Sequence, residues 1–582
     1  MSAEWIRVSE NLKIQFLSLD SNILKFGQAQ SHLAADFLAR GCSISRVFCN
    51  SMLKGSCIPL EELEQATKLS KKDLDLLCSA CKRQASSMIS NFGTDAFYLD
   101  DYIDQGLYEQ YALEASAVSP ESWHKFCIDK YAVGKISAYE FFLKYKLDSE
   151  IIPDPLFNEY KQKLLTALKV MASAPSLLKN YRPESVISFN HLYSQNNAYT
   201  QIANRMGIST YSIQHGEHSI ERLQTLNMFK TTKVMLSTPA SPIWKTKESE
   251  MPSSVDVKKT ISHFQGLITG KSGLTYSEKM DNYDPRKILK ITNDNPVILV
   301  TLSSEDEIFS AGLVDALPET GLRDAFPNQI DFIHGVLEAA SLRKELNFII
   351  RIHPRMLSNK RDSRNASSLD HLKEILDNSS RNVFVNWPSH GVSIYDLFRI
   401  TNVGLNYRSQ TGYEMLACGI PVVVGISKYH IRPISGFRIA ENALDMVKNI
   451  DQAIIDGPKV VNSLSAFKWY GFVFNHHVAP ISQSASFSFS SIRPKNNGTL
   501  LSIWRKSTKL VQLRIPIVVE VIEKLELRGS RDRGADSRFF EVVAKTLDGI
   551  HMSNSEPLGP ATSEEVAAAA NGIRKLVGLA NL

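Results

Sequence analysis

The sequence predicts an α/β protein with two Rossmann-like domains, and three observations support this fold class. Short apolar runs typical of buried parallel strands alternate with segments whose apolar residues recur at helical spacing. The chain of 582 residues is too long for one hydrophobic core. Polar residues and glycines directly follow several predicted strands, which is where open α/β sheets bind ligands.

The first domain is expected at residues 1–285. Its strands are predicted at residues 13–19, 44–49, 185–189, 209–213 and 233–237. Helices are predicted at residues 31–40, 155–174 and 197–206. Between the second and third strands, helical spacing of apolar residues predicts a helical insertion at about residues 59–146.

The second domain is expected at residues 286–480, after a polar connector rich in proline and serine. Its strands are predicted at residues 297–302, 347–352, 383–386, 403–406 and 421–424. Helices are predicted at residues 329–344, around 394–398 and from Gly412 onward. Residues 481–582 form a C-terminal extension to which the sequence assigns no role.

Composition narrows the class of protein. A hydrophobic content of 43% with 22% charged residues is that of a soluble globular protein, and no apolar run is long enough to cross a bilayer. The net charge of +5 is too small for this length to indicate nucleic-acid binding. The N-terminus lacks the pattern of a signal peptide, so a cytoplasmic location is expected. Cys78 and Cys81 form a single CxxC pair and are interpreted as structural.

One segment, residues 457–519, contains no Asp or Glu and combines basic with aromatic side chains. Such a segment can dock on the anionic inner face of the cell membrane, or on a phosphate-bearing acceptor. The alternative is a solvated basic rim. The basic residues are Lys459, Lys468, Arg493, Lys495, Arg505, Lys506, Lys509 and Arg514, and the aromatic ones include Trp469, Tyr470, Phe472, Phe474 and Trp504.

Candidate binding residues follow the first two strands of the second domain. Ser303, Ser304 and Glu305 come directly after the strand at 297–302, where they can cap a helix, bind a metal or hydrogen-bond a sugar. Arg351, His353 and Arg355 surround the end of the next strand. Arginine suits phosphate or carboxylate groups, which predicts an anion site here.

A third candidate is the turn after the strand at 403–406. Ser409 and Thr411 place hydroxyls at the start of a helix that faces the carboxyl ends of the strands, and Gly412 permits close approach of the backbone. Glu414, in the first turn, can cap the helix or reach a ribose. The pattern predicts a phosphate site, although an ordinary capped helix has the same appearance.

The first domain contributes Gln214 to Glu217 at the end of the strand at 209–213. His215 can act as a general base because its ordinary pKa lies near neutrality, and Glu217 can act as a base or orient one. The alternative is a structural histidine beside a turn.

These residues carry a resemblance. The runs TLSSEDE (301–307) and NYRSQTGYEMLACGIPVVV (406–424), with His353-Pro354 between them, look like the C-terminal half of two-domain GT-B glycosyltransferases, above all the capsule and lipopolysaccharide group that includes Kdo transferases. The turn at Gln214 to Gly216 is similar to the HG motif of those enzymes and of CDP-glycerol polyolphosphotransferases. The likeness spans about residues 185–426. It implies that His353, Ser409, Thr411 and Glu414 bind the donor nucleotide and that His215 or Glu217 lies near the chemistry.

The expected function is therefore transfer of a sugar from a nucleotide-sugar donor, with a CMP-activated sugar as one candidate, to a glycan or lipid-linked acceptor of a surface polysaccharide or lipopolysaccharide. No cofactor is expected, and the lack of a DxD pair favours a metal-independent reaction. The pair Tyr407-Arg408 departs from the small residues commoner in the family, so the nucleotide is left open. The alternatives are a CDP-glycerol-type polyolphosphotransferase, a nucleotide-sugar epimerase and a non-catalytic saccharide-binding protein.

Overall fold

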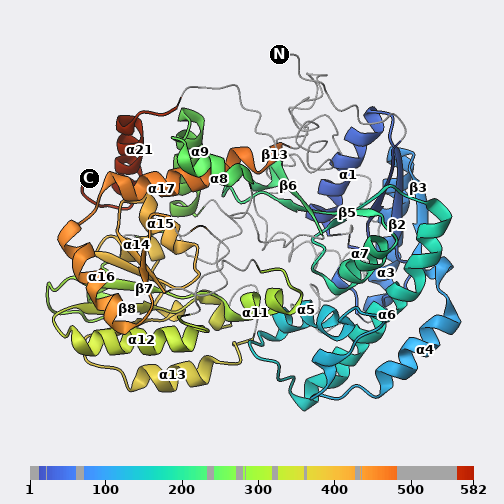
Figure 1. The fold of residues 1–582 in the computed structure, drawn as a ribbon, viewed down its shortest axis with the longest axis horizontal. Helices are drawn as coiled ribbons and strands as arrows, with labels where there is room; N and C mark the ends of the chain where they lie inside the picture. Colours follow the sequence, from blue (N-terminus) through green and yellow to red (C-terminus); the bar gives the residue numbers. More distant parts are fainter. Residues whose placement is uncertain are drawn as a thin grey trace.

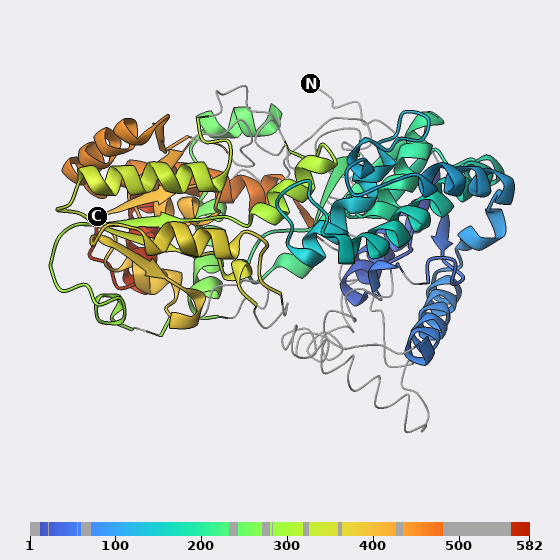
Figure 2. The same cartoon turned by 90° about the horizontal axis from the view of Figure 1, so that it is seen from below.

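The computed structural model describes residues 12–20, 23–54, 56–59, 71–231, 242–270, 280–281, 283–317, 325–358, 364–425, 433, 435–480 and 560–582. Within these ranges the chain forms two α/β domains that lie side by side (Figures 1 and 2). Each domain is built on one sheet.

The first sheet contains β1 (Lys13–Leu17), β2 (Ser43–Phe48), β3 (Asp95–Tyr98), β4 (Ser185–Phe189), β5 (Ser209–His215), β6 (Thr225–Lys230) and β13 (Ala479–Pro480). Its strand order is β13-β6-β5-β4-β1-β2-β3. β1 to β5 are parallel, whereas β6 and β13 are antiparallel to their neighbours. From β3 to β6 this is the 3-2-1-4-5-6 order of a Rossmann sheet.

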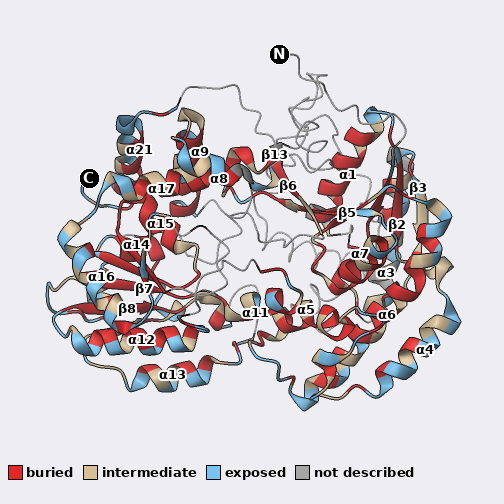
Figure 3. Ribbon diagram, in the orientation of Figure 1, coloured by how far each residue is buried: buried red, intermediate tan, exposed pale blue. Residues whose placement is uncertain are grey.

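Helices cover the faces of this sheet, as expected for parallel strands that are buried on both sides (Figure 3). The helices of this domain are α1 (Leu24–Ala39), α3 (Lys71–Phe92), α4 (Gln105–Ser116), α5 (Val133–Tyr145), α6 (Asp154–Tyr181) and α7 (Ser194–Arg205). Of these, α4 and α5 pack against α6.

The second sheet contains β7 (Val297–Thr301), β8 (Asn347–Arg351), β9 (Val383–Asn386), β10 (Val403–Asn406), β11 (Val422–Gly425) and β12 (Arg438–Ala440). All pairs are parallel, and the order β12-β11-β10-β7-β8-β9 is again that of a Rossmann sheet. Its helices include α11 (Glu305–Leu313), α12 (Gln329–Leu342), α13 (Leu369–Asp377), α14 (Ile394–Phe398), α15 (Thr411–Ala417) and α16 (Ala443–Asp456). The predicted fold class of two Rossmann-like domains is confirmed.

Four further helices complete the hydrophobic core of the second domain: α8 (Pro242–Ser249), α9 (Ser254–Ile268), α17 (Val460–Gly471) and α21 (Ser563–Leu576). Trp244 and Phe264 of α8 and α9 share one hydrophobic cluster with Leu299 of β7. The division expected at residue 285 therefore cuts through a packed unit. Ile573 of α21 belongs to the same cluster, so the end of the C-terminal extension is part of the second core.

Several helices and strands match those predicted from the periodicity of apolar residues, and others differ. β4, β9 and β10 have the predicted bounds, while α1 and α6 are longer than predicted. The insertion after β2 is not wholly helical, because β3 adds a strand at the sheet edge. β6 was not predicted, and the strand expected at 233–237 lies outside the described residues.

The carboxyl edges of the two sheets face each other across the domain interface. α11 follows β7 and packs against α5 of the first domain (Figure 1). Phe309 of α11 stacks on Phe142 of α5 with ring centroids 5.6 Å apart. Residues that follow β4 and β7 meet in a small apolar cluster made of Leu192, Ala311, Ala316 and Leu317.

The aromatic residues in the described part of the basic segment are packed into the protein, whereas Lys459 is exposed. Trp469, Tyr470, Phe472 and Phe474 are buried in the core of the second domain, so these rings are not available to a membrane. Lys468 donates to the main-chain oxygen of Glu248 at 2.7 Å. The basic residues from Arg493 to Arg514 lie outside the described residues. Among the described helices, none combines the length and apolar character needed to cross a bilayer.

Candidate active site

Each sheet has a switch point where the strand order reverses, between β1 and β4 in the first domain and between β7 and β10 in the second. Crevices at switch points are where doubly wound sheets bind ligands, because two loops diverge there. The residues predicted from sequence follow β5, β7, β8 and β10. The structure thus brings them to the two carboxyl edges that face each other.

The residues after β7 begin α11. The main-chain N–H of Ser303 donates to Oε1 of Gln329 at 2.7 Å. Ser304 is the N-terminal flanking residue of α11, and its hydroxyl donates to Oδ1 of Asp306 at 2.9 Å. Burial raises the pKa of Glu305 to about 7. Ser304 occupies the expected position at the start of α11, but its side chain makes no capping hydrogen bond.

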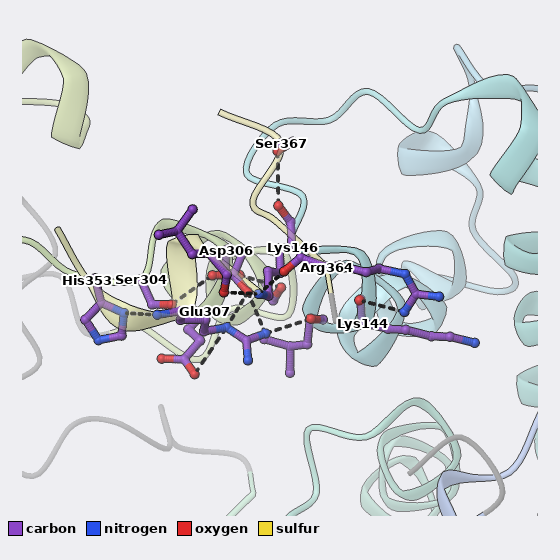
Figure 4. Close-up of polar contacts among 12 residues, drawn as sticks. Lys144, Lys146, Ser304, Asp306, Glu307, His353, Arg364 and Ser367 are labelled. Atoms are coloured by element: carbon purple, nitrogen blue, oxygen red, sulfur yellow. Dashed lines mark hydrogen bonds and ion pairs between the residues drawn. The ribbon is translucent and has the colours of Figure 1, made fainter. Parts of the chain in front are cut away.

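Arg355 joins the two domains, beside Asp306 and Glu307, which are labelled in Figure 4. Its Nε and Nη2 atoms lie 2.8 and 2.7 Å from Oδ2 of Asp306, and Nη2 also donates to the main-chain oxygen of Leu143 in α5 at 2.7 Å. Glu307 lies 3.7 Å away. The charge of this arginine is therefore compensated by protein groups.

Arg351 and His353 flank the same strand end. Arg351 is buried and donates to Oδ1 of Asn386 at the end of β9. Burial, and to a smaller extent the positive charges of Arg355, Arg351 and Lys146, lower the pKa of His353 to about 3. His353 is consequently neutral at pH 7, and its Nδ1 accepts from the N–H of Arg355 at 3.2 Å. It can hydrogen-bond a ligand but supplies no positive charge.

The turn after β10 leads into α15. Two of its N–H groups are used locally: that of Thr411 donates to Oγ of Ser409 at 3.4 Å, and that of Gly412 to the main-chain oxygen of Ser409 at 3.3 Å. The hydroxyls of Ser409 and Thr411 lie 3.2 Å apart. A Cβ atom on Gly412 would lie 2.9 Å from Cγ of Asn406, so close packing on that side chain requires glycine here.

Glu414 is buried one turn further along α15, where its carboxylate accepts a hydrogen bond from the hydroxyl of Tyr395 at 3.0 Å. This contact fixes α15 on α14. It gives Glu414 a structural partner inside the domain, in place of the capping contact considered from sequence.

In the first domain, His215 is the last residue of β5, and its ring is buried 5.4 Å from that of Phe189. Glu217 is exposed. A Cβ atom on Gly216 between them would lie 2.2 Å from Oγ1 of Thr225, so only glycine fits this turn. His215 and Glu217 therefore point into different environments, one buried and one solvated.

Sequence reasoning missed Asp20, at the switch point of the first sheet. It follows the first predicted strand directly, so the rule applied to the other strand ends would have selected it. Asp20 is fully buried and its Oδ2 accepts from Nδ2 of Asn196 at 3.2 Å. Burial raises the pKa of Asp20 to about 7. A carboxyl group titrating near neutrality at a switch point is a candidate for proton transfer.

Arg408 is a second residue whose position the sequence did not reveal. Its backbone has a φ of 57°, which is uncommon for a residue other than glycine. The side chain turns toward α12, where Nη2 donates to the main-chain oxygen of Pro327 at 3.3 Å. Arg408 therefore faces the Glu305 side of the site and not the turn at Ser409.

The chain matches no protein-family model and no curated protein. Among solved structures it is similar to the UDP-GlcNAc 2-epimerase from Neisseria meningitidis bound to UDP-GlcNAc, with 12% identity, 79% of this chain and 96% of that chain covered and a TM-score of 0.27. It is also similar to the calicheamicin glycosyltransferase, with 10% identity, coverages of 80% and 94% and a TM-score of 0.24. A third similar structure is that of a spinosyn rhamnosyltransferase, with 8% identity, 80% of this chain and 96% of that chain covered and a TM-score of 0.24.

Because the sequence identities and TM-scores are low, the fold is assigned from the strand order and the arrangement of the two sheets. Two Rossmann sheets of the same strand order, with their carboxyl edges opposed across an interdomain interface, define the GT-B architecture.

Proposed function

We propose that this protein is a GT-B glycosyltransferase that moves a sugar from a nucleotide-sugar donor to a glycan or lipid-linked acceptor of a surface polysaccharide. The observation that supports it best is the opposition of the two switch-point edges, joined through Leu192 and α11. A reaction between two bound substrates needs two sites that face each other at close range.

In this proposal the donor lies on the second domain. The hydroxyls of Ser409 and Thr411 hydrogen-bond the phosphate of the donor, and neutral His353 hydrogen-bonds the nucleotide. Arg351 lies at the neighbouring strand end and supplies positive charge to the site, although its described partner is Asn386. The acceptor enters from the first domain, where His215 is the proposed base and Glu217 the residue that orients the acceptor. The domain interface excludes water that would otherwise hydrolyse the donor.

A nucleotide-binding screen tests the donor site. Thermal shifts with CMP, CDP, UDP and GDP are compared, because a ligand that binds only the folded state raises its melting temperature. The double variant Ser409→Ala/Thr411→Val should lose the shift, whereas Ser341→Ala, which removes an exposed hydroxyl from α12, should retain it. Equal shifts in both variants would exclude this turn as the donor site.

Product analysis separates the proposed activity from its alternatives. A transferase releases nucleotide from its donor much faster when an acceptor is present. Interconversion of the donor sugar without acceptor would instead indicate an epimerase. Transfer of glycerol phosphate from CDP-glycerol would indicate a polyolphosphotransferase, and binding without turnover a saccharide-binding protein.

The proposal includes a cytoplasmic location with peripheral contact at the inner face of the membrane. With Trp469, Tyr470, Phe472 and Phe474 buried, that contact would depend on the basic residues between Arg493 and Arg514. Such attraction is screened by salt. Sedimentation with anionic vesicles should therefore be strong at low ionic strength and weak at high ionic strength, and its absence at low ionic strength would remove this part of the proposal.

A further inference from the structure

A cavity of about 370 Å³ opens at the carboxyl edge of the second sheet, at the N-terminal ends of α11, α12 and α13. Its lining combines residues of both domains: Asp148, from the chain after α5, faces Glu305, Gln329 and Met356 of the second domain. A volume of this size is within the range of roughly 300–1,000 Å³ that small-molecule sites occupy. The cavity lies apart from the turn at Ser409, because none of the residues from 409 to 414 lines it.

The titratable side chains of the lining are three carboxyl groups and the imidazole of His371. Asp148, Glu305 and Asp331 all border the cavity, and among the described residues none of the three forms an ion pair with lysine or arginine. Asp148 accepts from the hydroxyl of Ser367 at 2.9 Å, and Asp331 accepts from Nδ2 of Asn328 at 2.8 Å. These are neutral donors, so the charges of Asp148 and Asp331, and the charge of Glu305 in its ionised form, are solvated or hydrogen-bonded but not neutralised.

Asp306 and Glu305 are neighbours in the chain but differ in their partners. Asp306 is one residue from Glu305, and its charge is matched by the guanidinium of Arg355. The carboxyl group of Glu305 is attracted to Arg408 at longer range and accepts a hydrogen bond from the main-chain N–H of Gln329. Its Oε1 atom is buried and has no hydrogen-bond partner among the described residues. A buried carboxylate oxygen without a partner is costly, which indicates that a donor group is missing from this site.

Three kinds of group could pair with this carboxylate: a metal ion, a neutral hydroxyl and an ammonium group. Within the described residues no three His, Cys, Asp or Glu side chains are arranged to hold a metal ion, which argues against direct coordination. A neutral polyol would satisfy hydrogen bonds but leave the charges uncompensated. A primary ammonium group supplies three donors and a positive charge in one compact unit.

We infer that this cavity binds a small organic ligand through a primary ammonium group held between Asp148 and Glu305. An amino sugar and an aliphatic polyamine share this chemistry. Since the two carboxylates belong to different domains, the bound ligand bridges them and stabilises the observed domain arrangement. The inference does not depend on the proposed transferase activity.

Calorimetric titration of the full chain tests it without any nucleotide present. Glucosamine, spermidine and glucose are the three probes, with glucose serving as the neutral counterpart of glucosamine. At least one amine should bind and glucose should not. Binding of glucosamine alone identifies an amino-sugar site, and binding of spermidine alone a polyamine site. Failure of both amines to bind, or equal binding of glucose, would overturn the inference.

Variants localise the binding. Asp148→Asn should weaken amine binding about tenfold or more, the scale of one lost charge-assisted hydrogen bond. Asp331→Asn should also weaken it, and provides a second variant because its side chain is exposed. Asp370→Asn is the matched control, since Asp370 is an exposed carboxylate of α13 already paired with Lys373. Unchanged affinity in both Asp148→Asn and Asp331→Asn would place the amine elsewhere and overturn the inference.

A proton-linked signal gives an independent readout. Because burial raises the pKa of Glu305 to about 7, part of this carboxyl group is protonated at neutral pH. A bound ammonium favours the ionised form, so binding at pH 7 should release protons. The measured heat should then depend on the ionisation enthalpy of the buffer, and Glu305→Gln should remove that dependence.

Discussion

The Nζ atom of Lys146 donates to the main-chain oxygen of Leu357 at 3.2 Å and to that of Arg364, which places a fully buried lysine of the first domain inside the second (Figure 4). In the other direction, the main-chain oxygen of Lys146 accepts from the N–H and the hydroxyl of Ser367, at 3.2 and 3.0 Å. Lys146 itself adopts a left-handed conformation with a φ of 51° at the end of α5. These contacts join the domains beside the candidate site.

Replacement of this lysine should loosen the domain contact. Lys146→Met keeps much of the volume but removes the donor to the partly buried main-chain oxygens of Leu357 and Arg364, so the free energy of unfolding should fall by about 1–3 kcal/mol. Chemical denaturation measures the change. Lys125→Met, at an exposed position of the same domain, is the matched control. Equal stability of the two variants would mean that the contact contributes little.

The pair Arg355–Asp306 offers a sharper test of the same interface. Asp306→Asn leaves Arg355, whose side chain is only 12% exposed, without its partner charge. Removing one member of a buried pair costs about 3–5 kcal/mol, because the other charge stays desolvated. Glu307→Gln, whose carboxylate is 3.7 Å from Arg355 and 49% exposed, should change the stability much less. Thermal unfolding of both variants decides this, and similar losses would contradict the assignment of Asp306 as the main partner.

His353 predicts a pH dependence of stability. Its pKa is lowered from an ordinary 6.5 to about 3 by burial and by neighbouring cations, so between these values the unfolded chain binds more protons than the folded one. Stability should therefore fall as the pH is lowered from about 6.5. His353→Asn keeps an acceptor for the N–H of Arg355 and removes the titration, so it should flatten this slope. Denaturation at a series of pH values measures the slope, with His334→Asn as the control for loss of an imidazole.

The second sheet was predictable from sequence because its strands are short runs of Val, Ile and Leu that end in polar residues. Val297 to Thr301 is buried at every position, which is the pattern of a parallel strand covered on both faces. β3 was missed since Asp95 to Tyr98 lies at the sheet edge and is only partly buried, so its pattern is weak. β6 was missed because it is stabilised by antiparallel pairing with β5, a tertiary contact that the local pattern of apolar residues does not predict.

The site was less predictable than the fold, because sequence places a side chain at a strand end but does not give its partner. Arg355 was predicted to bind a phosphate, and the structure adds a contact with Asp306 that the sequence did not indicate. Glu414 was predicted to reach a ribose or to cap the helix, and the structure adds a hydrogen bond from Tyr395. Both partners are remote in sequence. The cavity beside Asp148 depends on the interface between the domains, for which the sequence carried no signal.

Asp20 supplies the last prediction, which has the opposite sign to that of His353. Burial raises its pKa from 3.8 to about 7, so the folded state holds a proton that the unfolded chain releases. Stability contributed by this group is complete below about pH 4 and is lost as the pH rises through 7. Asp20→Asn retains an oxygen that accepts from Asn196 but cannot ionise. It should increase the free energy of unfolding at pH 8 by about 2–4 kcal/mol, at 1.36 kcal/mol per pKa unit, and should change it little at pH 4.

Denaturant titrations at the two pH values measure the difference, and Asp101→Asn, at an exposed position of the same domain, is the control for loss of a carboxylate. A destabilised Asp20→Asn variant at pH 8 would show that the ionised carboxylate has a stabilising partner. A stabilised variant would mean that this chain keeps at its first switch point a carboxyl group that weakens the fold at neutral pH. Such a cost is typical of residues retained for function, because a group with a pKa near 7 can exchange protons with a substrate under physiological conditions.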